Sequence, residues 1–559
     1  MSATKHASIV VAGAGPVGMC VAIEAALRGH DVVIVEPRPA GEAPSAKCNT
    51  VAARTMETFR RFGIADRVRA AGLPDDFPTD VIYTSSIAGP EIVRIAQPSR
   101  RERDLPGFPD SEWLTPEPVV RISQIYLEPI LDERMRSLPN VTVLNDTTVE
   151  RYEQTDRSVT TYARRGDGSE VALTSRFLAG CDGGRSTIRK AMGVDLIGDA
   201  EIGRTRTSLV RSTGILPLFG KRRPSWMSWI INDRVRGNVI AINGDDLWLL
   251  HRAVPGTDFE TVDADGSIQA LLGAEEPVTY EVVHHEDWIG RRLVAERFRD
   301  RNVFVAGDAA HLWVPYAGYG MNAGIADGIE LAWLLASVLD GWGADALLDT
   351  YEAERLPITD QVSRFAMDLV LENAAALATR PPTPELADPG PAGDELRELV
   401  GPVLRDLNLP QFAPEGLNFG YFYDASPIIA YDGVAQPSYK MGEVTPSTVP
   451  GCRMPHFDVD GRPVLDHLGP DYTLIRFDPH LNVSAFVDAA AAVGLPLLIV
   501  DAERPETPNV FDHPLLLVRF DQHVAWRGHD APGGTALVDL LRGRSTTNDI
   551  DPPTGETDN

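Results

Sequence analysis

Cysteine is scarce in this chain, which contains only Cys20, Cys48, Cys181 and Cys452 among 559 residues. The four are scattered, form no CxxC pair and show no spacing typical of metal ligands. We therefore expect neither a disulfide framework nor a zinc site.

Positive charge is also in short supply, with 52 Lys and Arg against 80 Asp and Glu and a net charge of −28. Such a surface repels phosphate backbones and anionic lipid, which argues against nucleic acid or a membrane as a partner. No apolar run approaches membrane-spanning length, and the opening MSATKHA lacks the basic and apolar regions of a signal peptide. We therefore expect a cytoplasmic protein.

The length exceeds what a single hydrophobic core usually serves, so several domains are expected. Strand and helix patterns alternate at first, strand patterns dominate from about 200 to 290, and a parallel-sheet style returns with RNVFVAGDAAH. A stretch rich in proline and glycine, ATRPPTPELADPGPAGDE, indicates a linker before a small α/β domain. We predict a first domain in two pieces, residues 1–195 and 291–375, with a sheet inserted between them at 196–290. A linker at 376–410 and a C-terminal domain at 411–559 follow.

The segment SIVVAGAGPVGMCVAIEAALRGHDVVIVEPR predicts a strand, a glycine turn, a helix and a second strand. Gly13, Gly15 and Gly18 form GxGxxG, with Pro16 and Val17 between them, and Glu36 ends the second strand. The glycines allow a tight turn, backbone approach to a pyrophosphate and close helix packing, while the acid suits ribose hydroxyls. A lone GxGxxG is weak evidence, but this context predicts a dinucleotide site. GWGADA at 341–346 follows a helix instead, so only one such unit is visible.

Two later motifs carry further glycine. CDGGRSTIRKAMG contains Asp182, Gly183, Ser186 and Arg189, and on spacing alone Ser186 could simply cap a helix. GDAAHLWVPYAGYGMNAGIADGIELAW, residues 307–333, begins directly after an apolar run and is dense in glycine, although each glycine costs backbone entropy to order.

Taken together, the three motifs resemble, in order and spacing, those of the single-component FAD-dependent aromatic hydroxylases, the group of para-hydroxybenzoate hydroxylase and phenol hydroxylase. The resemblance covers residues 1–370 well and extends more weakly to the end. It implies an α/β fold: a Rossmann-like FAD-binding domain, an inserted β-sheet substrate domain and a C-terminal thioredoxin-like domain, here without CxxC. It also implies further cofactor-binding residues, namely Lys47, Gln124, Asp182, Arg189, Gly307, Asp308, Gly320, Met321 and Asn322.

In this family Asp308 would bind the ribityl chain, and Gly320 to Asn322 would form a helix N-terminus that stabilises anionic reduced flavin. The chain departs from the family at several positions. Lys47 and Asn49 stand where relatives often carry arginine, Tyr319 where they often carry glutamine, and Glu330 where they often carry asparagine. His311 is expected to be structural.

The resemblance implies that NADPH or NADH reduces FAD, that O2 forms a flavin C4a-hydroperoxide, and that a small aromatic, phenolic substrate is hydroxylated. The alternative is a flavin oxidoreductase of the same fold that acts on a non-phenolic substrate without net hydroxylation. A base that deprotonates the phenol is expected but not identified, and a lone aromatic residue or histidine in a sheet is more often core. A homodimer is adopted from the family. The candidate catalytic residues are Asn49, His251, Pro315, Tyr316 and Tyr319.

Overall fold

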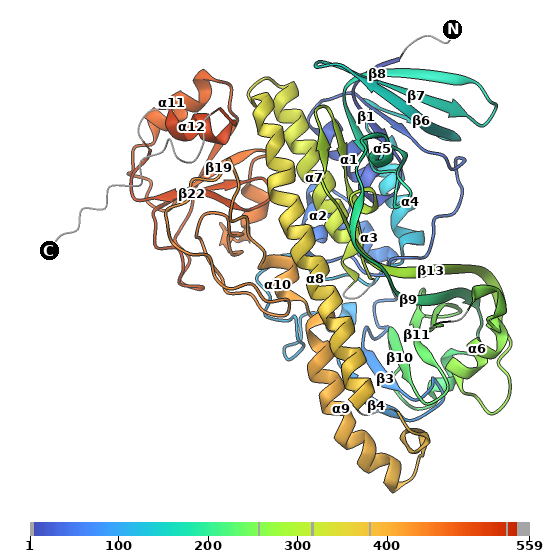
Figure 1. Cartoon of the computed structure of the whole chain (residues 1–559). Helices are drawn as coiled ribbons and strands as arrows, with labels where there is room; N and C mark the ends of the chain where they lie inside the picture. Colours follow the sequence, from blue (N-terminus) through green and yellow to red (C-terminus); the bar gives the residue numbers. More distant parts are fainter. Residues whose placement is uncertain are drawn as a thin grey trace.

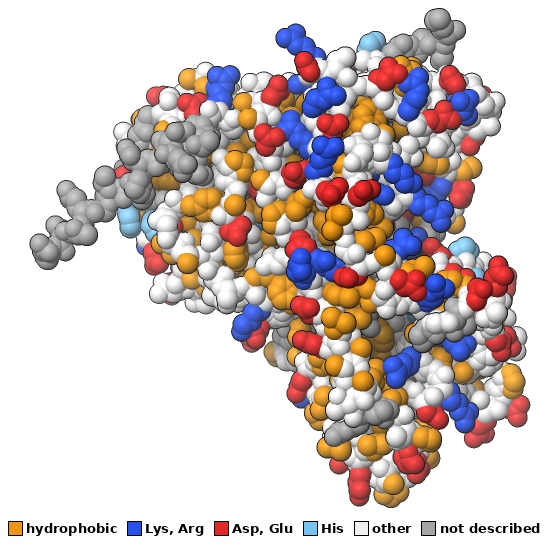
Figure 2. All heavy atoms as spheres, viewed as in Figure 1, with side chains coloured by type: hydrophobic (Ala, Val, Ile, Leu, Met, Phe, Trp, Pro, Cys, Tyr) orange, Lys and Arg blue, Asp and Glu red, His pale blue; other side chains and the backbone are white. Residues whose placement is uncertain are grey.

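The computed structural model describes residues 5–254, 256, 258–314, 318–379, 382–532 and 535–544. Two eight-stranded sheets and a four-stranded sheet account for most of the strands (Figure 1). On the face in Figure 2 acidic and basic side chains are intermixed and do not gather into patches of one sign.

The first sheet contains the nucleotide-binding unit expected from the sequence. Its order is β14-β15-β8-β1-β2-β5, with β7 and β6 added beside β8, and β15, β8, β1, β2 and β5 run parallel. The strands are β1 (Lys5–Ala12), β2 (Val32–Val35), β5 (Val141–Leu144), β6 (Thr147–Gln154), β7 (Val159–Arg165), β8 (Glu170–Gly180), β14 (Arg299–Asp300) and β15 (Val303–Val305). The helices of this part are α1 (Pro16–Leu27), α2 (Ala53–Arg61), α3 (Ala65–Ala71), α4 (Gln124–Arg136), α5 (Thr187–Ala191) and α7 (Gly320–Leu339).

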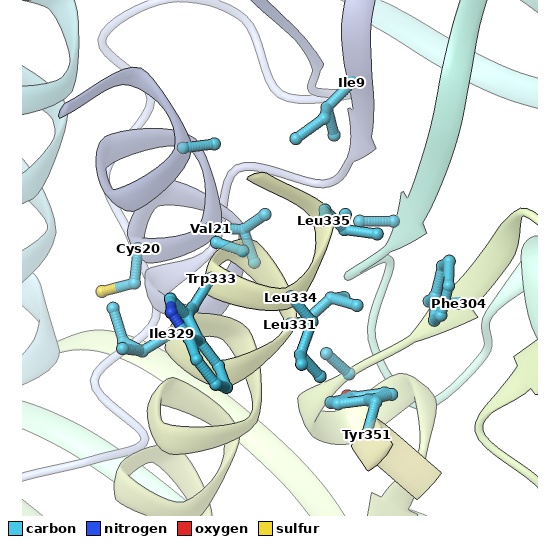
Figure 3. Packing of buried hydrophobic residues seen from close by; sticks show 14 of the residues in the cluster. Ile9, Cys20, Val21, Phe304, Ile329, Leu331, Trp333, Leu334, Leu335 and Tyr351 are labelled. Carbon is cyan, nitrogen blue, oxygen red and sulfur yellow. The ribbon is translucent and has the colours of Figure 1, made fainter. Parts of the chain in front are cut away.

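The core lies where α1 and α7 pack together beside this sheet. Ile325, Ile329 and Trp333 of α7 are spaced one turn apart and are at most 5 % exposed, as their spacing requires for a helix with one buried face. In Figure 3 Ile329 and Trp333 lie toward Cys20 of α1, while Leu331 and Leu334 turn toward Tyr351 and Phe304. Among the described helices α7 alone has the length and composition to cross a membrane, and 83 % of its apolar window is buried in the molecule.

The second sheet has the order β16-β13-β9-β12-β11-β10-β3-β4. Its strands are β3 (Val81–Thr84), β4 (Glu91–Ile95), β9 (Leu196–Arg211), β10 (Met227–Ile231), β11 (Arg236–Ala241), β12 (Leu247–Ala253), β13 (Glu281–Ala295) and β16 (His311–Leu312). The sheet therefore takes β3 and β4 from within the span 1–195 that was predicted to be the first domain alone. Short strands so far from their partners give no local signal of which sheet they join. Helix α6 (Ala264–Leu272) packs on one face of this sheet, with Leu271 close to Gly237.

The segment 376–410, which was predicted to be a linker, is mostly helical. Helix α8 (Asp349–Thr379) extends into it and α9 (Pro391–Phe412) fills its second half, alongside β4 (Figure 1). Proline is tolerated in the first turn of a helix, where Pro391 lies, so proline content alone does not indicate a linker. The tertiary partner decides the structure, since Gly401 of α9 lies against Ile92 and Val93 of β4.

The C-terminal part is a separate α/β unit. Its sheet has the order β20-β19-β21-β22. The elements are α10 (Glu415–Phe419), β17 (Asp458–Val459), β18 (Arg462–Pro463), β19 (Tyr472–Arg476), α11 (Ser484–Ala492), β20 (Leu497–Asp501), β21 (Leu515–Arg519), β22 (Val524–Gly528) and α12 (Ala536–Leu541). Arg28, directly after α1, donates a hydrogen bond to Asp471 over 2.8 Å, which joins this unit to the first domain.

Candidate functional site

The glycines of the turn between β1 and α1 are of two kinds: some allow the protein's own packing, and one leaves the backbone open to a ligand. Gly13 has a φ of +99°, and a Cβ added at Gly18 would lie 1.9 Å from the carbonyl oxygen of Gly13, so both serve the protein's own packing. Gly15, at the N-cap of α1, has nothing within 4 Å of such a Cβ. Gly15 therefore presents bare backbone to open space at a helix N-terminus, as an anion requires. Pro16 begins the helix, and Val17 turns toward Gly307.

Glu36 lies beside this turn at the end of β2. Its carboxylate accepts hydrogen bonds from the Ala14 backbone N–H (2.6 Å) and from Arg38 Nε (2.8 Å). Arg38 also reaches Glu128 (2.9 Å), which in turn accepts a hydrogen bond from Gln124 Nε2 (2.5 Å). Two predicted cofactor residues, Glu36 and Gln124, are thus joined by a network that sequence reasoning missed. The position of Arg38 two residues after Glu36 was the only available signal.

The second motif links the first to the third. The Asp182 carboxylate accepts hydrogen bonds from the N–H groups of Thr187 (2.7 Å) and Ile188 (3.1 Å), and Ser186 caps α5 by accepting from the Arg189 N–H (2.9 Å). Arg189 donates to the carbonyl of Ala309 over 3.0 Å. The capping role of Ser186 is therefore present, and these contacts tie α5 to the Gly307 turn.

The Gly307 turn follows β15 and is fixed from α7. Gly307 has a φ of +60°, and its N–H donates to Asp327 Oδ2 over 3.3 Å. Asp327 also bonds His311 Nε2 at 2.7 Å and accepts from Arg355 Nε at 2.8 Å. Sequence reasoning did not single out Asp327, because its three partners come from distant segments.

Asp308 has an exposed side chain, yet desolvation raises the pKa of its carboxyl above the ordinary value, against the opposing effects of His311 and Lys47. The carboxyl is therefore accessible to a ligand although neighbouring atoms reduce its hydration. Such a position suits a hydroxyl-rich ligand chain.

The glycines of α7 let this helix pack closely against the Gly307 turn and α1. This close packing explains why the entropic cost of ordering the glycines is tolerated. A Cβ at Gly324 would lie 2.9 Å from the Gly307 Cα, and one at Gly328 would lie 2.9 Å from Val21. The N-terminus of α7, at Gly320 and the half-buried Met321, is thereby held beside the other two motifs. The first N–H groups of a helix have no acceptor within it and favour negative charge.

Asn322 fixes the segment 45–52 against this helix N-terminus. Its side chain accepts from the Ala52 N–H (2.9 Å) and donates to the carbonyls of Thr50 (3.1 Å) and Gly318 (2.9 Å). Asn49 lies in the same segment, and its Oδ1 is buried with no hydrogen-bond partner among the described residues. An orphaned buried acceptor of this kind indicates a place for a ligand donor.

Lys47 affects the pKa of the Asp308 carboxyl, but its ion-pair partner lies on the second sheet. Its ammonium pairs with Glu286 of β13 at 2.9 Å, and its side chain is 62 % exposed. The segment 45–52 therefore bridges the α7 N-terminus and the second sheet, and a cofactor contact of Lys47 stays a prediction.

The other candidate catalytic residues fall in different places. Tyr319 is 6 % exposed, and its hydroxyl donates to the Leu417 carbonyl at 2.6 Å. At this boundary with the C-terminal part the hydroxyl is held by the backbone, and a catalytic role for Tyr319 stays a prediction. Pro315 and Tyr316 lie outside the described residues.

His251 lies on β12 of the second sheet. Burial lowers the pKa of its imidazole to about 4, so the ring is neutral near pH 7 and a weaker base than a free histidine. A role for His251 as the base expected from the resemblance stays a prediction.

Glu330 lies on α7 in a polar cavity that Arg54 and Tyr421 also line. Tyr423 donates a hydrogen bond to it over 3.0 Å, and burial, with the nearby Glu354, raises its pKa well above the ordinary value. A raised folded-state pKa stabilises the fold below the unfolded pKa, and this contribution is lost as pH rises through the folded pKa.

Replacing Glu330 with glutamine, a neutral isostere, should therefore help most at alkaline pH. Above the unfolded pKa each pH unit costs the wild type about 1.4 kcal/mol until Glu330 ionises. The thermal midpoint of Glu330→Gln relative to wild type should rise between pH 6 and pH 9. A constant or falling difference would show that Glu330 is already ionised in the fold.

The residues fit FAD: a bare glycine at a helix N-terminus, an acid at the end of β2, an accessible Asp308 and a second helix N-terminus come from segments that contact one another directly. Comparison with known proteins gives the same result. A model of the family described as "FAD binding domain" matches residues 6–366. The chain belongs to this family.

Among curated relatives, the chain is similar to the FAD-dependent monooxygenase apdD of Emericella nidulans, with 29 % identity over 93 % of this chain and 87 % of the relative. Among solved structures it is similar to the rebeccamycin biosynthetic enzyme RebC with reduced flavin, with a TM-score of 0.88 and 30 % identity over 97 % of this chain and 100 % of that chain. It is also similar to aklavinone-11 hydroxylase in complex with FAD and aklavinone, with a TM-score of 0.79 and 26 % identity over 97 % and 99 % of the two chains. The chain is an FAD-dependent monooxygenase of the single-component aromatic hydroxylase class.

Proposed function

We propose that this enzyme hydroxylates a fused polycyclic aromatic compound, with NADPH or NADH as the reductant. The proposal is supported above all by similarity along nearly the whole chain to a structure with bound aklavinone and to RebC, which has also been soaked with chromopyrrolic acid. Bound FAD would supply the redox chemistry by which one atom of O2 enters the substrate and the other leaves as water.

The protein's part is to hold, orient and shield. Gly15, Glu36 and Asp308 would hold the cofactor, and the N–H groups at the start of α7 would stabilise negative charge on its reduced ring. The second sheet would form the opposite wall, and exclusion of water would limit release of hydrogen peroxide.

The face of this sheet that bears Glu286 also carries aromatic side chains. Tyr83 and Trp229, paired between β3 and β10, stack with ring centroids 6.3 Å apart and planes 13° apart. Nearer to Glu286 on the same face, His251 and Trp288 make an edge-to-face contact with ring centroids 6.3 Å apart. Such a surface suits a ligand with several fused rings.

A screen with 18O2 tests the proposal. The FAD-loaded enzyme should oxidise NADPH or NADH faster with fused-ring hydroxyquinones than with simple phenols, and the product should gain one labelled oxygen. Accelerated NAD(P)H oxidation without labelled product would favour the alternative, an oxidoreductase of the same fold. No response to any aromatic compound would overturn both.

The homodimer and the cytoplasmic location expected from the sequence belong to this proposal too. Light scattering of the purified chain should give twice the monomer mass of 60.8 kDa.

A further inference from the structure

One face of the second sheet presents a row of polar side chains in strict register. Across neighbouring antiparallel strands, Asn238 pairs with His251, His251 with Thr207, and Thr207 with Glu286. Directly paired residues point to the same face of a sheet. Because Glu286 bonds Lys47 at 2.9 Å, this face is turned toward the segment 45–52 and hence toward the α7 N-terminus.

The hydrogen bonds on this face fix the tautomer of His251. The Trp288 indole N–H, which can only donate, lies 2.8 Å from Thr207 Oγ1. Thr207 Oγ1 lies 2.7 Å from His251 Nδ1, and the described residues give its hydroxyl proton no other acceptor. The threonine therefore donates to Nδ1, and the neutral imidazole keeps its proton on Nε2.

Asn238 supplies the complementary group. It is 8 % exposed, yet its Oδ1 has no hydrogen-bond partner among the described residues. The Cβ atoms of directly paired antiparallel residues are about 5 Å apart. A fixed N–H donor and an unused carbonyl acceptor thus stand side by side on the face that the proposed function gives to the substrate.

We propose that His251 and Asn238 form a donor and acceptor pair that positions the substrate by an edge carrying a carbonyl next to an O–H or N–H group. A lactam has such an edge, whereas a plain hydrocarbon does not. The substrate carbonyl accepts from His251 Nε2, and the substrate O–H or N–H donates to Asn238 Oδ1. This inference rests on the proposed function and narrows its substrate class.

His251 is a positioning residue in this arrangement and needs no change of protonation. Burial alone lowers its pKa, to about 4, with no contribution from a charged group. The charged groups that face it are Glu286 on β13 and Lys47 from the segment 45–52, and these two neutralise each other. Binding should therefore be independent of pH between about 5.5 and 8.5.

The test uses the FAD-loaded full chain and three probes of the same shape: the lactam phenanthridinone, which carries the full edge, the lactone 3,4-benzocoumarin, which lacks the donor, and phenanthrene, which lacks both groups. Binding is measured by fluorescence quenching. His251→Phe and Asn238→Leu should each weaken phenanthridinone binding at least about tenfold and phenanthrene binding less than twofold. Benzocoumarin should respond to His251→Phe but not to Asn238→Leu. His251→Gln, which keeps an N–H donor, should restore most of the affinity.

Controls separate binding from folding. Because Asn238 Oδ1 makes no hydrogen bond within the described chain, Asn238→Leu should not lower the thermal midpoint. His285→Phe alters a histidine whose Nδ1 bonds Ser208 in the adjacent, oppositely directed row, so it should leave binding of every probe unchanged.

Equal losses for phenanthridinone and phenanthrene, no loss for either variant, or a binding inflection near pH 6.5 would overturn the inference. Oxygen incorporation from 18O2 is measured separately in the wild type and the variants. If the wild-type product gains labelled oxygen, the proposed function holds even where this inference fails.

Discussion

The Gly15→Ala variant should fold like the wild type and fail to retain FAD. Gly15 has a φ of −73°, which alanine adopts freely, and nothing in the protein lies within 4 Å of the added Cβ. The methyl group would instead enter the space through which a pyrophosphate must approach the backbone. We expect FAD affinity to fall at least about tenfold, while the thermal midpoint of the cofactor-free protein is unchanged.

Gly18→Ala provides the matched contrast within the same motif. Its Cβ would meet the Gly13 carbonyl oxygen at 1.9 Å, so α1 must move away from the turn and the cofactor-free protein should lose about 1–3 kcal/mol of stability. Isothermal titration with FAD and thermal melts of both cofactor-free variants measure the two effects. If Gly15→Ala bound FAD normally, the turn would not be the pyrophosphate site.

The local patterns of the sequence predicted those parts of the fold that neighbouring residues determine. The β1, α1 and β2 unit, the N-terminus of α7 at Gly320 and the burial of Ile325, Ile329 and Trp333 all follow from turn chemistry and periodicity. The helix α9 did not, because its proline content resembles a linker and its buried face is set by β4, about 300 residues earlier.

The candidate site likewise contains residues that the sequence could predict and residues that it could not. The glycines and acids of the three motifs could be found from spacing, since each acts through its own backbone or a fixed local geometry. The partners of Lys47, Tyr319 and Asp327 could not, because Glu286, Leu417 and Arg355 lie 28 to 239 residues away. Only the closed fold shows that one loop, 45–52, joins the cofactor motifs to the second sheet.

Replacing Asp327 with asparagine should cause the largest loss of stability among these variants. Asp327 and the Arg355 side chain are 0 % and 2 % exposed, so the change leaves a buried guanidinium without its charge partner, which typically costs about 3–5 kcal/mol. The same carboxylate holds Gly307 and His311, so FAD should also dissociate more readily. Chemical denaturation and flavin fluorescence measure the two effects.

The pH dependence identifies the cause. Desolvation alone would raise the pKa of Asp327, but Arg355 and His311 lower it below the ordinary value. A lowered folded-state pKa gives stability that is present above the unfolded pKa and is lost as pH falls through the folded pKa. Asp327→Asn should therefore lose more stability relative to wild type at pH 7 than at pH 3.

Asp132→Asn is the control. It breaks the exposed pair with Arg136 and should cost no more than about 0.5 kcal/mol of stability. A similarly small cost at Asp327 would mean that Arg355 finds another buried partner, for which Glu330, 3.8 Å away, is the nearest carboxylate.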